Sequence, residues 1–284
     1  MKREILCSVA LISYNQESTI RDCLQSVLAQ EINGVLQVVI ADDASSDKTF
    51  DIISSFLEDG RVVWKVLPRE TNLGMLKNWA RAIDACDGEF IALLEGDDLW
   101  IMPNKLTIQI EALLQNPSLQ AVVSDATVLN ERDDSQYPHY VTKYTKDATI
   151  NFSEMLVENP FPTCTTVFRR KPEQWKLPKF YWKSPYADWI VHVVNASLGD
   201  ILFLSIQTSQ YRLHSVGVFG GQDKERHLER SLWLLSHYAT SYPEHKEHIL
   251  TKKRDVSYIL SESYRQKGRW LKYFNNRLNR FFYG

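Results

Sequence analysis

The sequence predicts an α/β fold in which a largely parallel sheet is flanked by helices. Short apolar runs of strand length alternate with amphipathic segments of helix length, and short polar turns join them. The chain has 284 residues, of which 44% are hydrophobic and 24% charged. It can therefore bury a large core, and its composition is that of a soluble globular protein.

Each expected element has its own signal. The apolar runs that predict strands lie at 9–12, 35–40, 62–66, 90–94, 121–123, 163–170 and 201–206. Apolar faces at helical spacing lie within 20–28, 50–56, 75–83, 106–114 and 190–198, and a helical pattern runs from 223 onward. Ser18 and Ser46 are the expected caps of the first two helices. Residues 130–150 show no clear period and predict a long loop over the site or a boundary.

The composition excludes several classes of protein. A net charge of -2 gives no reason to expect nucleic acid or another polyanion as a partner of the whole molecule. The four cysteines lack CxxC spacing, which argues against a zinc site or a disulfide framework and for a reducing compartment. No apolar stretch is long enough to span a membrane, and the N-terminus lacks the apolar region of a signal peptide. A cytoplasmic protein is therefore expected.

An acidic cluster, Glu95-Gly96-Asp97-Asp98, directly follows the apolar run at 90–94. Three carboxylates in four residues repel one another at a strand end unless a positive charge lies among them. Mg²⁺ takes oxygen ligands and commonly bridges carboxylates to substrate phosphates. Open α/β sheets place ligands at the carboxyl ends of their strands. The cluster therefore predicts a metal–diphosphate site, and the alternative is a solvated acidic turn.

Several motifs occur in an order and spacing that point to one family. They are Ser13-Tyr14-Asn15, Asp42-Asp43-Ala44-Ser45-Ser46-Asp47, Asn72-Leu73-Gly74, Glu95-Gly96-Asp97-Asp98, Ala187-Asp188-Trp189 and Tyr211-Arg212-Leu213-His214. On these motifs the chain resembles, from about Ser8 to His214, the family 2 inverting glycosyltransferases of the bacterial surface-polysaccharide type. It departs from that family at Glu95, where Asp is usual, and at Ala187, where many members have Glu.

The resemblance implies a GT-A fold, which is a Rossmann-like nucleotide-diphospho-sugar transferase domain with a mixed sheet flanked by helices. It divides the chain into a nucleotide-sugar-binding half at 1–129, an acceptor-binding half at 130–222 and a C-terminal helical extension at 223–284. Within these, the region 130–185 is expected to select the donor sugar and the acceptor.

The resemblance also implies a donor, a UDP- or dTDP-linked sugar, and a set of residues that bind it. The nucleotide-binding residues are Ser13, Tyr14, Asn15, Glu17, Asp42, Asp43, Asn72, Gly74, Asn78, Glu95, Gly96, Asp97 and Arg212. Asp43 is expected to accept a hydrogen bond from the base while Asp42 supports the nucleoside, and the alternative for Asp43 is an Asx turn with Ser45. The alternative for Tyr14 is packing, and for Arg212 a surface ion pair.

A metal ion and a general base complete the implied site. Asp97, Asp98 and His214 are the expected ligands of Mn²⁺ or Mg²⁺, although a lone histidine such as His214 is more often structural. Asp188 is the expected base that deprotonates a hydroxyl of a glycan or lipid-linked acceptor. Trp182, Tyr186 and Trp189 are expected to wall it, and the alternative role of Asp188 is a helix N-cap.

Other classes of function stay open at this point. The sugar transferred is of the hexosyl or N-acetylhexosaminyl type if the chain is an enzyme. The alternative is a catalytically inactive nucleotide-sugar-binding or assembly protein on the same fold. A nucleotidyltransferase usually carries a Gly-rich, basic loop after its first strand, and the loop at 13–17 has neither feature. The sequence does not specify an oligomeric state.

The C-terminal tail at 265–284 is basic, contains no acidic residue and is rich in aromatic side chains. Trp270, Phe274, Leu278 and Phe281 follow helical spacing and predict one apolar stripe. Such a stripe with flanking cations suits peripheral contact with an anionic membrane, which here would be the inner face of the plasma membrane. The alternative is a terminal helix docked on the catalytic domain.

Overall fold

The structure, a computed structural model of the chain, describes residues 4–214, 224–270 and 272–273. Within them one mixed sheet of ten strands forms the centre of the fold. Its strands are β1 (Ile5–Ser13), β2 (Val35–Asp42), β3 (Val63–Val66), β4 (Phe90–Glu95), β5 (Leu99–Trp100), β6 (Leu119–Asn130), β7 (Ser135–Tyr137), β8 (Ala148–Ile150), β9 (Val167–Arg169) and β10 (Asp200–Leu213). The strand order β3-β2-β1-β4-β9-β6-β10-β5 places β1 between β2 and β4.

The sheet is parallel where the sequence alternates strand and helix. β1 pairs in parallel with β2 and β4, and β6 pairs in parallel with β10. Short β9 lies antiparallel between β4 and β6 and joins the two parallel parts. The ends of β1, β2 and β4 therefore meet at one edge of the sheet.

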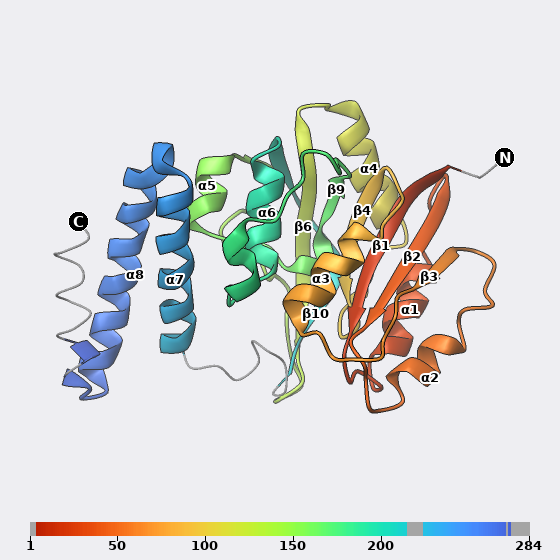
Figure 1. Cartoon of the computed structure of the whole chain (residues 1–284), viewed down its shortest axis with the longest axis horizontal. Coiled ribbons are helices and arrows are strands. Elements are labelled where there is room, and N and C mark those ends of the chain that lie inside the picture. The colour runs from red at the N-terminus through yellow and green to blue at the C-terminus, as the bar shows by residue number, and fades with distance from the viewer. Residues whose placement is uncertain (1–3, 215–223, 271, 274–284) are drawn as a thin grey trace.

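Helices cover both faces of this sheet (Figure 1). They are α1 (Ile20–Leu28), α2 (Thr49–Ser54), α3 (Met75–Asp84), α4 (Lys105–Gln115), α5 (Phe152–Val157), α6 (Asp188–Ala196), α7 (Lys224–Ser241) and α8 (Lys246–Gln266), with 3₁₀ turns at Thr163–Thr165, Lys179–Lys183 and Pro243–His245. Alternate side chains of β1 point to opposite faces of the sheet and pack in different cores. Val9 and Leu11 share a core with Leu24 of α1, whereas Ala10 shares one with Trp79 of α3.

The predicted α/β fold is confirmed, and two strands are longer than their apolar runs indicated. β6 and β10 extend to Asn130 and Leu213, beyond the expected 121–123 and 201–206. Their extensions carry buried polar side chains that pair across strands, as Ser124 Oγ and Thr208 Oγ1 do at 2.6 Å. Apolar periodicity does not detect strands of this kind.

Several local predictions are wrong. The N-cap of α1 is Thr19, whose hydroxyl donates to the Gly96 carbonyl at 2.9 Å, and not Ser18. The N-cap of α2 is Lys48, and not Ser46. The expected loop at 130–150 contains β7, which pairs with β6, and β8, which pairs with β10. The strand expected at 163–170 begins with a 3₁₀ turn before β9. Helix α5 was not expected, although Asn151 and Glu154 form a capping box there.

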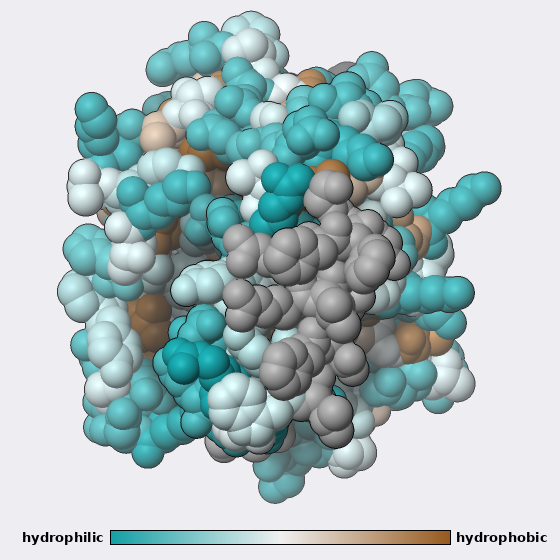
Figure 2. Space-filling view, turned by 90° about the vertical axis from the view of Figure 1, so that its left-hand side faces the viewer, coloured by the Kyte–Doolittle hydropathy of each residue, from teal (hydrophilic) through white to brown (hydrophobic). Residues whose placement is uncertain are grey.

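Helices α7 and α8 pair on the far side of α5 and α6 from β1 and β2 (Figure 1). Figure 2 views this side and shows mostly hydrophilic side chains on its described surface. Among the described residues, no helix combines the length and the apolar character that crossing a membrane requires.

The described start of the C-terminal tail is docked on α7. The Glu225 carboxylate is buried and lies 3.2 Å from Lys267 Nζ and 2.9 Å from Arg269 Nη1. Tyr273 is buried against Leu260 and Tyr264 of α8. Trp270 is 53% exposed. The other members of the predicted apolar stripe, Phe274, Leu278 and Phe281, lie outside the described residues.

Candidate active site

The ends of β1, β2 and β4 carry most of the predicted site residues. The Asp43 N–H donates to the Ser13 carbonyl at 2.8 Å, and the Gly96 N–H donates to the Ile12 carbonyl at 2.9 Å. These contacts extend the parallel pairing by one residue and align the loops that follow. The motifs after the three strands therefore lie side by side, as the sequence predicts.

Asp42 organises the loop after β2. Its side chain is 1% exposed and accepts hydrogen bonds from Ser13 Oγ at 3.1 Å and Ser45 N at 3.1 Å. The Arg69 Nε atom donates to it at 2.8 Å. The turn contact to Ser45 thus comes from Asp42 and not from Asp43. With these partners Asp42 is placed to hold the walls of a nucleoside site.

Asp43 ties the same loop to the start of α3. Its two carboxylate oxygens accept the N–H groups of Leu73 at 2.7 Å and Gly74 at 2.9 Å, and its carbonyl accepts Asn72 Nδ2 at 3.0 Å. Gly74 has φ +82°, in the left-handed region that favours glycine. Each carboxylate oxygen has two lone pairs, so this arrangement leaves Asp43 acceptor capacity for a further donor.

The loop after β1 is fastened to the loop after β2. The Asn15 Oδ1 atom accepts the Ser46 N–H at 2.8 Å, and the Glu17 Oε2 atom accepts the Lys48 N–H at 2.9 Å. The Tyr14 side chain stays 50% exposed beside them. Asn15 and Glu17 therefore shape the site, while the Tyr14 ring is free to contact a ligand.

Asn78 holds α3 against β2. Its buried side chain donates from Nδ2 to the Ala41 carbonyl at 2.6 Å and accepts Arg81 Nε at 2.7 Å. Both ends of the amide are therefore occupied by the protein. The structure places Asn78 as a positioning residue behind Asp42.

The acidic cluster after β4 is contacted by the end of β10. The His214 Nε2 atom lies 2.8 Å from Asp97 Oδ2, and the Arg212 backbone N–H donates to Asp98 Oδ1 at 2.9 Å. Asp98 is 2% exposed, and its Oδ2 atom is buried without a hydrogen-bond partner in the described chain. Asp97, Asp98 and His214, the predicted metal ligands, thus come together.

Gly96 lies close to the side chains of the loop after β1 and of α1. A Cβ atom there would lie 2.5 Å from Gln16 Oε1 and 2.9 Å from Ile20 Cδ1. Both contacts are too short for carbon, so the ends of these two side chains would have to move to admit a larger residue.

Burial and crowding raise the affinity of this cluster for protons. Burial, followed by the charges of Asp98 and Asp97, raises the pKa of Glu95 well above its usual range. Burial and the charge of Asp97 likewise raise the pKa of Asp98. The hydrogen bond to Asp97 raises the pKa of His214. Carboxylates held so close in a dry environment are stabilised by a bound cation.

The Arg212 guanidinium pairs with carboxylates outside the cluster, and its charge also acts on Asp98. Its side chain forms ion pairs with Asp22 at 3.0 Å and Glu131 at 3.4 Å. Its Nε atom is buried without a partner in the described chain. The surface ion pair weighed for Arg212 is therefore present, and its contact with a phosphate stays a prediction.

Asp188 is the first residue of α6, and Ala187 is the N-cap. The Asp188 Oδ2 atom accepts Asn159 Nδ2 at 3.0 Å, whereas Oδ1 is buried without a partner in the described chain. Burial raises the pKa of the Asp188 carboxyl above its usual value. A buried carboxylate with one unoccupied oxygen and a raised pKa has the properties of a proton acceptor.

A cavity of about 540 Å³ joins Asp188 to the acidic cluster through Glu95. Its other lining residues are Met75, Trp79, Val128, Tyr137, His139, Tyr140, Asn159, Phe161, Pro162, Thr163, Tyr186, Ala187, Trp189, Tyr211, Leu213, His227 and Ser231. Two of the three expected wall residues, Tyr186 and Trp189, are among them. Trp182 is not, and its expected place in this wall is wrong. The lining combines aromatic rings with convergent polar side chains, as is typical of ligand sites.

Three residues of the cavity were not predicted from the sequence as site residues. Asn159 orients Asp188, and no local pattern marks it. His139 bonds through Nδ1 to the buried Asp125 carboxylate at 2.6 Å, and it lies in the tyrosine-containing segment that was expected near the site. His227 of α7 bonds to the Tyr186 hydroxyl at 2.9 Å. The helical extension therefore forms part of the cavity wall.

Comparison with known proteins agrees with this geometry. An uncharacterized protein of Mycobacterium tuberculosis, Rv1520, is 32% identical over 228 residues, which cover 80% of this chain but only 63% of that protein. The Escherichia coli protein WfgD, a UDP-Glc:alpha-D-GlcNAc-diphosphoundecaprenol beta-1,3-glucosyltransferase, is 29% identical over 78% of this chain and 83% of its own length.

Solved structures share the fold. Residues 1–349 of S. aureus TarS in complex with UDP-GlcNAc match with a TM-score of 0.65 and 20% identity, over 96% of this chain and 79% of that one. The mannosyltransferase PcManGT from Pyrobaculum calidifontis, in complex with GDP-Man and Mn²⁺, matches with a TM-score of 0.61 and 13% identity, over 99% and 85%. These likenesses confirm the GT-A fold.

The profile of glycosyl transferase family 2 matches residues 8–174. That span is more than half of the chain, and it contains the strand-end motifs that meet at the edge of the sheet together with the acidic cluster. The resemblance drawn from those motifs is confirmed, and the chain belongs to glycosyl transferase family 2.

Proposed function

We propose that the chain transfers a sugar from a UDP- or dTDP-linked donor to a hydroxyl group of a glycan or lipid-linked acceptor, with inversion at the anomeric carbon. The observation that carries this proposal is that Glu95 and Asp188 line one cavity, and that Asp188 Oδ1 has no partner in the described chain. A sugar bound between them would have the acidic cluster on one side and a proton acceptor on the other.

The donor nucleotide binds across the ends of β1 and β2. The free acceptor capacity of Asp43 meets an N–H group of the base, and the exposed Tyr14 ring covers it. The names of relatives support donors of this class, since WfgD uses UDP-Glc and TarS was solved with UDP-GlcNAc. The transferred sugar is accordingly a hexose or an N-acetylhexosamine.

The residues after β4 fit a divalent cation. No group of three or more His, Cys, Asp or Glu side chains is arranged to hold a metal by itself within the described chain. Mg²⁺, however, is usually bound by one or two carboxylates together with substrate phosphates. Asp97 and the unpaired Oδ2 of Asp98 would hold Mg²⁺ or Mn²⁺, with His214 orienting Asp97. When bound, the cation neutralises charge that develops on the leaving diphosphate.

Asp188 acts as the general base. The acceptor hydroxyl attacks the anomeric carbon from the face opposite the diphosphate, its proton passes to Asp188 Oδ1, and the bond between the anomeric carbon and the phosphate oxygen breaks. Asn159 holds the other carboxylate oxygen, so Oδ1 stays directed at the acceptor. The aromatic side chains of Tyr186 and Trp189 limit the access of water to this proton transfer.

Turnover with matched donors tests the proposal. The purified chain would be incubated with UDP-Glc, UDP-GlcNAc, dTDP-Glc or GDP-Man and with GlcNAc-diphosphoundecaprenol or a soluble glycan. We expect acceptor-dependent release of nucleoside diphosphate from one uridine or thymidine donor, and a product whose anomeric configuration by NMR is opposite to that of the donor. Retained configuration would refute the role of Asp188. Binding of a donor without release would identify a nucleotide-sugar-binding protein.

A further inference from the structure

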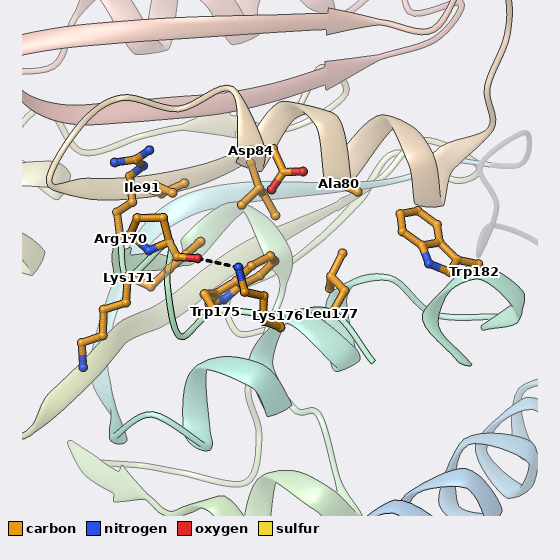
Figure 3. A pocket seen from close by; sticks show the side chains of 12 residues that line it. Ala80, Asp84, Ile91, Arg170, Lys171, Trp175, Lys176, Leu177 and Trp182 are labelled. Atoms are coloured by element: carbon orange, nitrogen blue, oxygen red, sulfur yellow. Dashed lines mark hydrogen bonds between the residues drawn. The ribbon is translucent and has the colours of Figure 1, made fainter. Parts of the chain in front are cut away.

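A second pocket lies beside the later half of α3 (Figure 3). It has a volume of about 320 Å³ and is walled by Ala80, Ile83 and Asp84 of α3, by Ile91 of β4 and Phe168 of β9, and by side chains of the segment 170–182 that follows β9. None of the residues assigned above to the donor, the cation or the base lines it. The proposed transfer reaction therefore does not account for the residues that line this pocket.

The floor of this pocket is aromatic and fixed. Trp175 is 8% exposed and stacks on Phe168 with ring centroids 6.1 Å apart and an interplanar angle of 17°. Its Nε1 atom donates to Asn195 Oδ1 at 3.1 Å. Trp182 is 52% exposed and lies beyond Ala80, at the end of the pocket nearest the start of α3 (Figure 3). Flat indole rings of this kind suit the C–H faces of sugar rings.

The rim of the pocket is positive. Arg170, Lys171 and Lys176 line it, and Asp84 is the one carboxylate among its described lining residues. Lys176 Nζ donates to the Pro172 carbonyl at 2.9 Å, and Lys171 Nζ donates to a backbone carbonyl at 3.4 Å. Neither contact neutralises a charge. The Arg170 guanidinium forms no hydrogen bond or close ion pair with any described residue, although its charge contributes to lowering the pKa of Asp87, which already pairs with Lys65.

This concentration of charge is unusual in the molecule. The whole chain has a net charge of -2, yet three basic residues and one acidic residue line this pocket. Elsewhere the described basic side chains often have acidic partners, as Lys65 does with Asp87 and Lys143 with Glu158. An unpaired guanidinium beside an aromatic floor favours an amphipathic anion, because guanidinium forks pair with carboxylate or phosphate oxygens.

The same two segments of the chain contribute different residues to the pocket and to the catalytic cavity. Met75 and Trp79 of α3 line the cavity, whereas Ala80 and Asp84 line the pocket. With a rise of 1.5 Å per residue, Asp84 lies about 13 Å along the helix from Met75. On the other side, Trp182 lines the pocket and Tyr186 lines the cavity, within the same short segment. A chain of sugar units lying along α3 could therefore occupy both.

We propose that this pocket binds an acidic sugar unit of the acceptor, one that carries a carboxylate or phosphate group. The ring of this unit lies against Trp175 and its anion pairs with Arg170 or Lys176, while a neighbouring unit lies against Trp182 at the other end of the pocket. A different unit of the same acceptor presents its hydroxyl group to Asp188. This inference rests on the proposed function for its place in the reaction, but the binding of acidic sugars by the pocket is measured without turnover.

Calorimetry on the full chain at low salt tests the binding. The probes are trigalacturonic acid with its carboxyl-reduced counterpart, and a phosphorylated mannotriose with its dephosphorylated form. We expect at least one acidic trimer to bind about tenfold tighter than its neutral counterpart, the worth of one charge-assisted pair. The two arms distinguish carboxylate from phosphate. The double variant Arg170→Gln/Lys176→Gln should abolish that difference.

A matched control and a second readout complete the test. Lys179→Gln/Lys183→Gln removes two exposed charges of the same segment that do not line the pocket, and it should keep the tenfold preference. Trp182→Ala should weaken acidic and neutral trimers alike. Release of nucleoside diphosphate from the donor in the absence of acceptor should be unchanged in all these variants. A chain that releases no diphosphate would contradict the proposed function, whereas the affinities for the trimers test the pocket.

Several results would overturn the inference. They are equal affinity for acidic and neutral trimers, no measurable binding of either acidic trimer, or an equal loss in the control variant. Binding to vesicles of phosphatidylglycerol that depends on Arg170 and Lys176, in the absence of sugar binding, would replace the acidic sugar with a lipid surface.

Discussion

The His214 Nε2 atom lies 2.8 Å from Asp97 Oδ2, and this contact joins the end of β10 to the loop after β4. The two residues are 117 positions apart in the chain. Two residues before His214, the Arg212 backbone N–H donates to Asp98 at 2.9 Å. The end of β10 therefore orients Asp97 and Asp98, while Asp98 Oδ2 has no hydrogen-bond partner in the described chain.

Asp97→Asn should lower the rate of transfer by about 10²–10³-fold, because charge stabilisation by a metal ion contributes several kcal/mol. Excess chelator should have the same effect on the wild type, and added Mn²⁺ or Mg²⁺ should reverse it. The measurement is diphosphate release, with circular dichroism to verify the fold. Asp59→Asn, which removes a surface carboxylate paired with Arg61, is the control and should keep full activity. Full wild-type activity in chelator would contradict the cation site.

Asp188→Asn should lower the rate of transfer by about 10²–10⁴-fold, the usual contribution of general acid–base catalysis. The substitution keeps the shape of the side chain but removes its basicity. Donor affinity, measured by calorimetry, should be nearly unchanged. A variant that instead loses donor binding or unfolds at a much lower temperature would show that Asp188 has a structural role.

The rate of transfer should fall on the acid side as Asp188 becomes protonated. Burial raises its pKa, and hydrogen bonds from the backbone N–H groups of Trp189 and Asp188 and from the Asn159 side chain oppose this rise by stabilising the charged form. Asn159→Ala should therefore raise the pKa of Asp188 further, so that the acid limb of the kcat profile moves to higher pH. Asp188→Asn should lack this limb. An acid limb that stays in place in Asn159→Ala would argue against Asp188 as the titrating group.

The elements that were predictable from sequence are those with apolar signals. β1, β2 and β4 are buried on both faces, so each reads as a short apolar run and the polar residue after it marks the edge of the sheet. This is why the strand-end motifs, including Asp43 and Asp97, could be placed before the structure. Asp188 was placed by its motif at the start of a helix, which α6 confirms.

The remainder depends on contacts between distant segments. Asn159 reaches Asp188 across 29 positions, and Arg212 reaches Asp22 across 190. Such pairs leave no local pattern, so neither the orientation of Asp188 nor the ion pairs of Arg212 could be read from the sequence. The contribution of α7 to the cavity was likewise unpredictable, because nothing in the sequence distinguishes His227 from the other polar residues of an amphipathic helix.

Two truncations separate docking of the tail from membrane contact. Removing 267–284 should destabilise the fold by about 1–3 kcal/mol, because the buried Glu225 carboxylate loses Lys267 and Arg269. Removing only 274–284 keeps these contacts and the buried Tyr273, so the chain that ends at Tyr273 should be more stable by that amount than the chain that ends at Gln266. Chemical denaturation measures both.

Vesicle binding by the same proteins tests the other interpretation of the tail. If the tail contacts an anionic membrane, the chain ending at Tyr273 should lose salt-sensitive co-sedimentation with anionic vesicles while it keeps the ion pairs of Glu225. Equal stability of the two truncated chains would contradict docking through Glu225, and vesicle binding that survives both truncations would exclude the tail as an anchor.

The contribution of His192 to the stability of the fold should fall as the pH drops from 7 to 5. This side chain is fully buried against Phe161, and neither ring nitrogen has a partner in the described chain. Burial lowers its pKa from 6.5 to about 4. Between these values the unfolded chain takes up a proton that the folded chain does not, so the folded state loses stability as the pH falls.

Between pH 7 and pH 5 the loss that this one histidine causes is about 2 kcal/mol, since each pH unit below 6.5 contributes about 1.4 kcal/mol. His192→Leu should remove that part of the pH dependence, because leucine fills the buried position of the imidazole with an apolar side chain and binds no proton. Urea denaturation at the two pH values gives the free energies of unfolding. His248→Gln, which changes an exposed histidine, should retain the full dependence. An unchanged pH dependence in His192→Leu would show that another group controls the acid sensitivity of the fold.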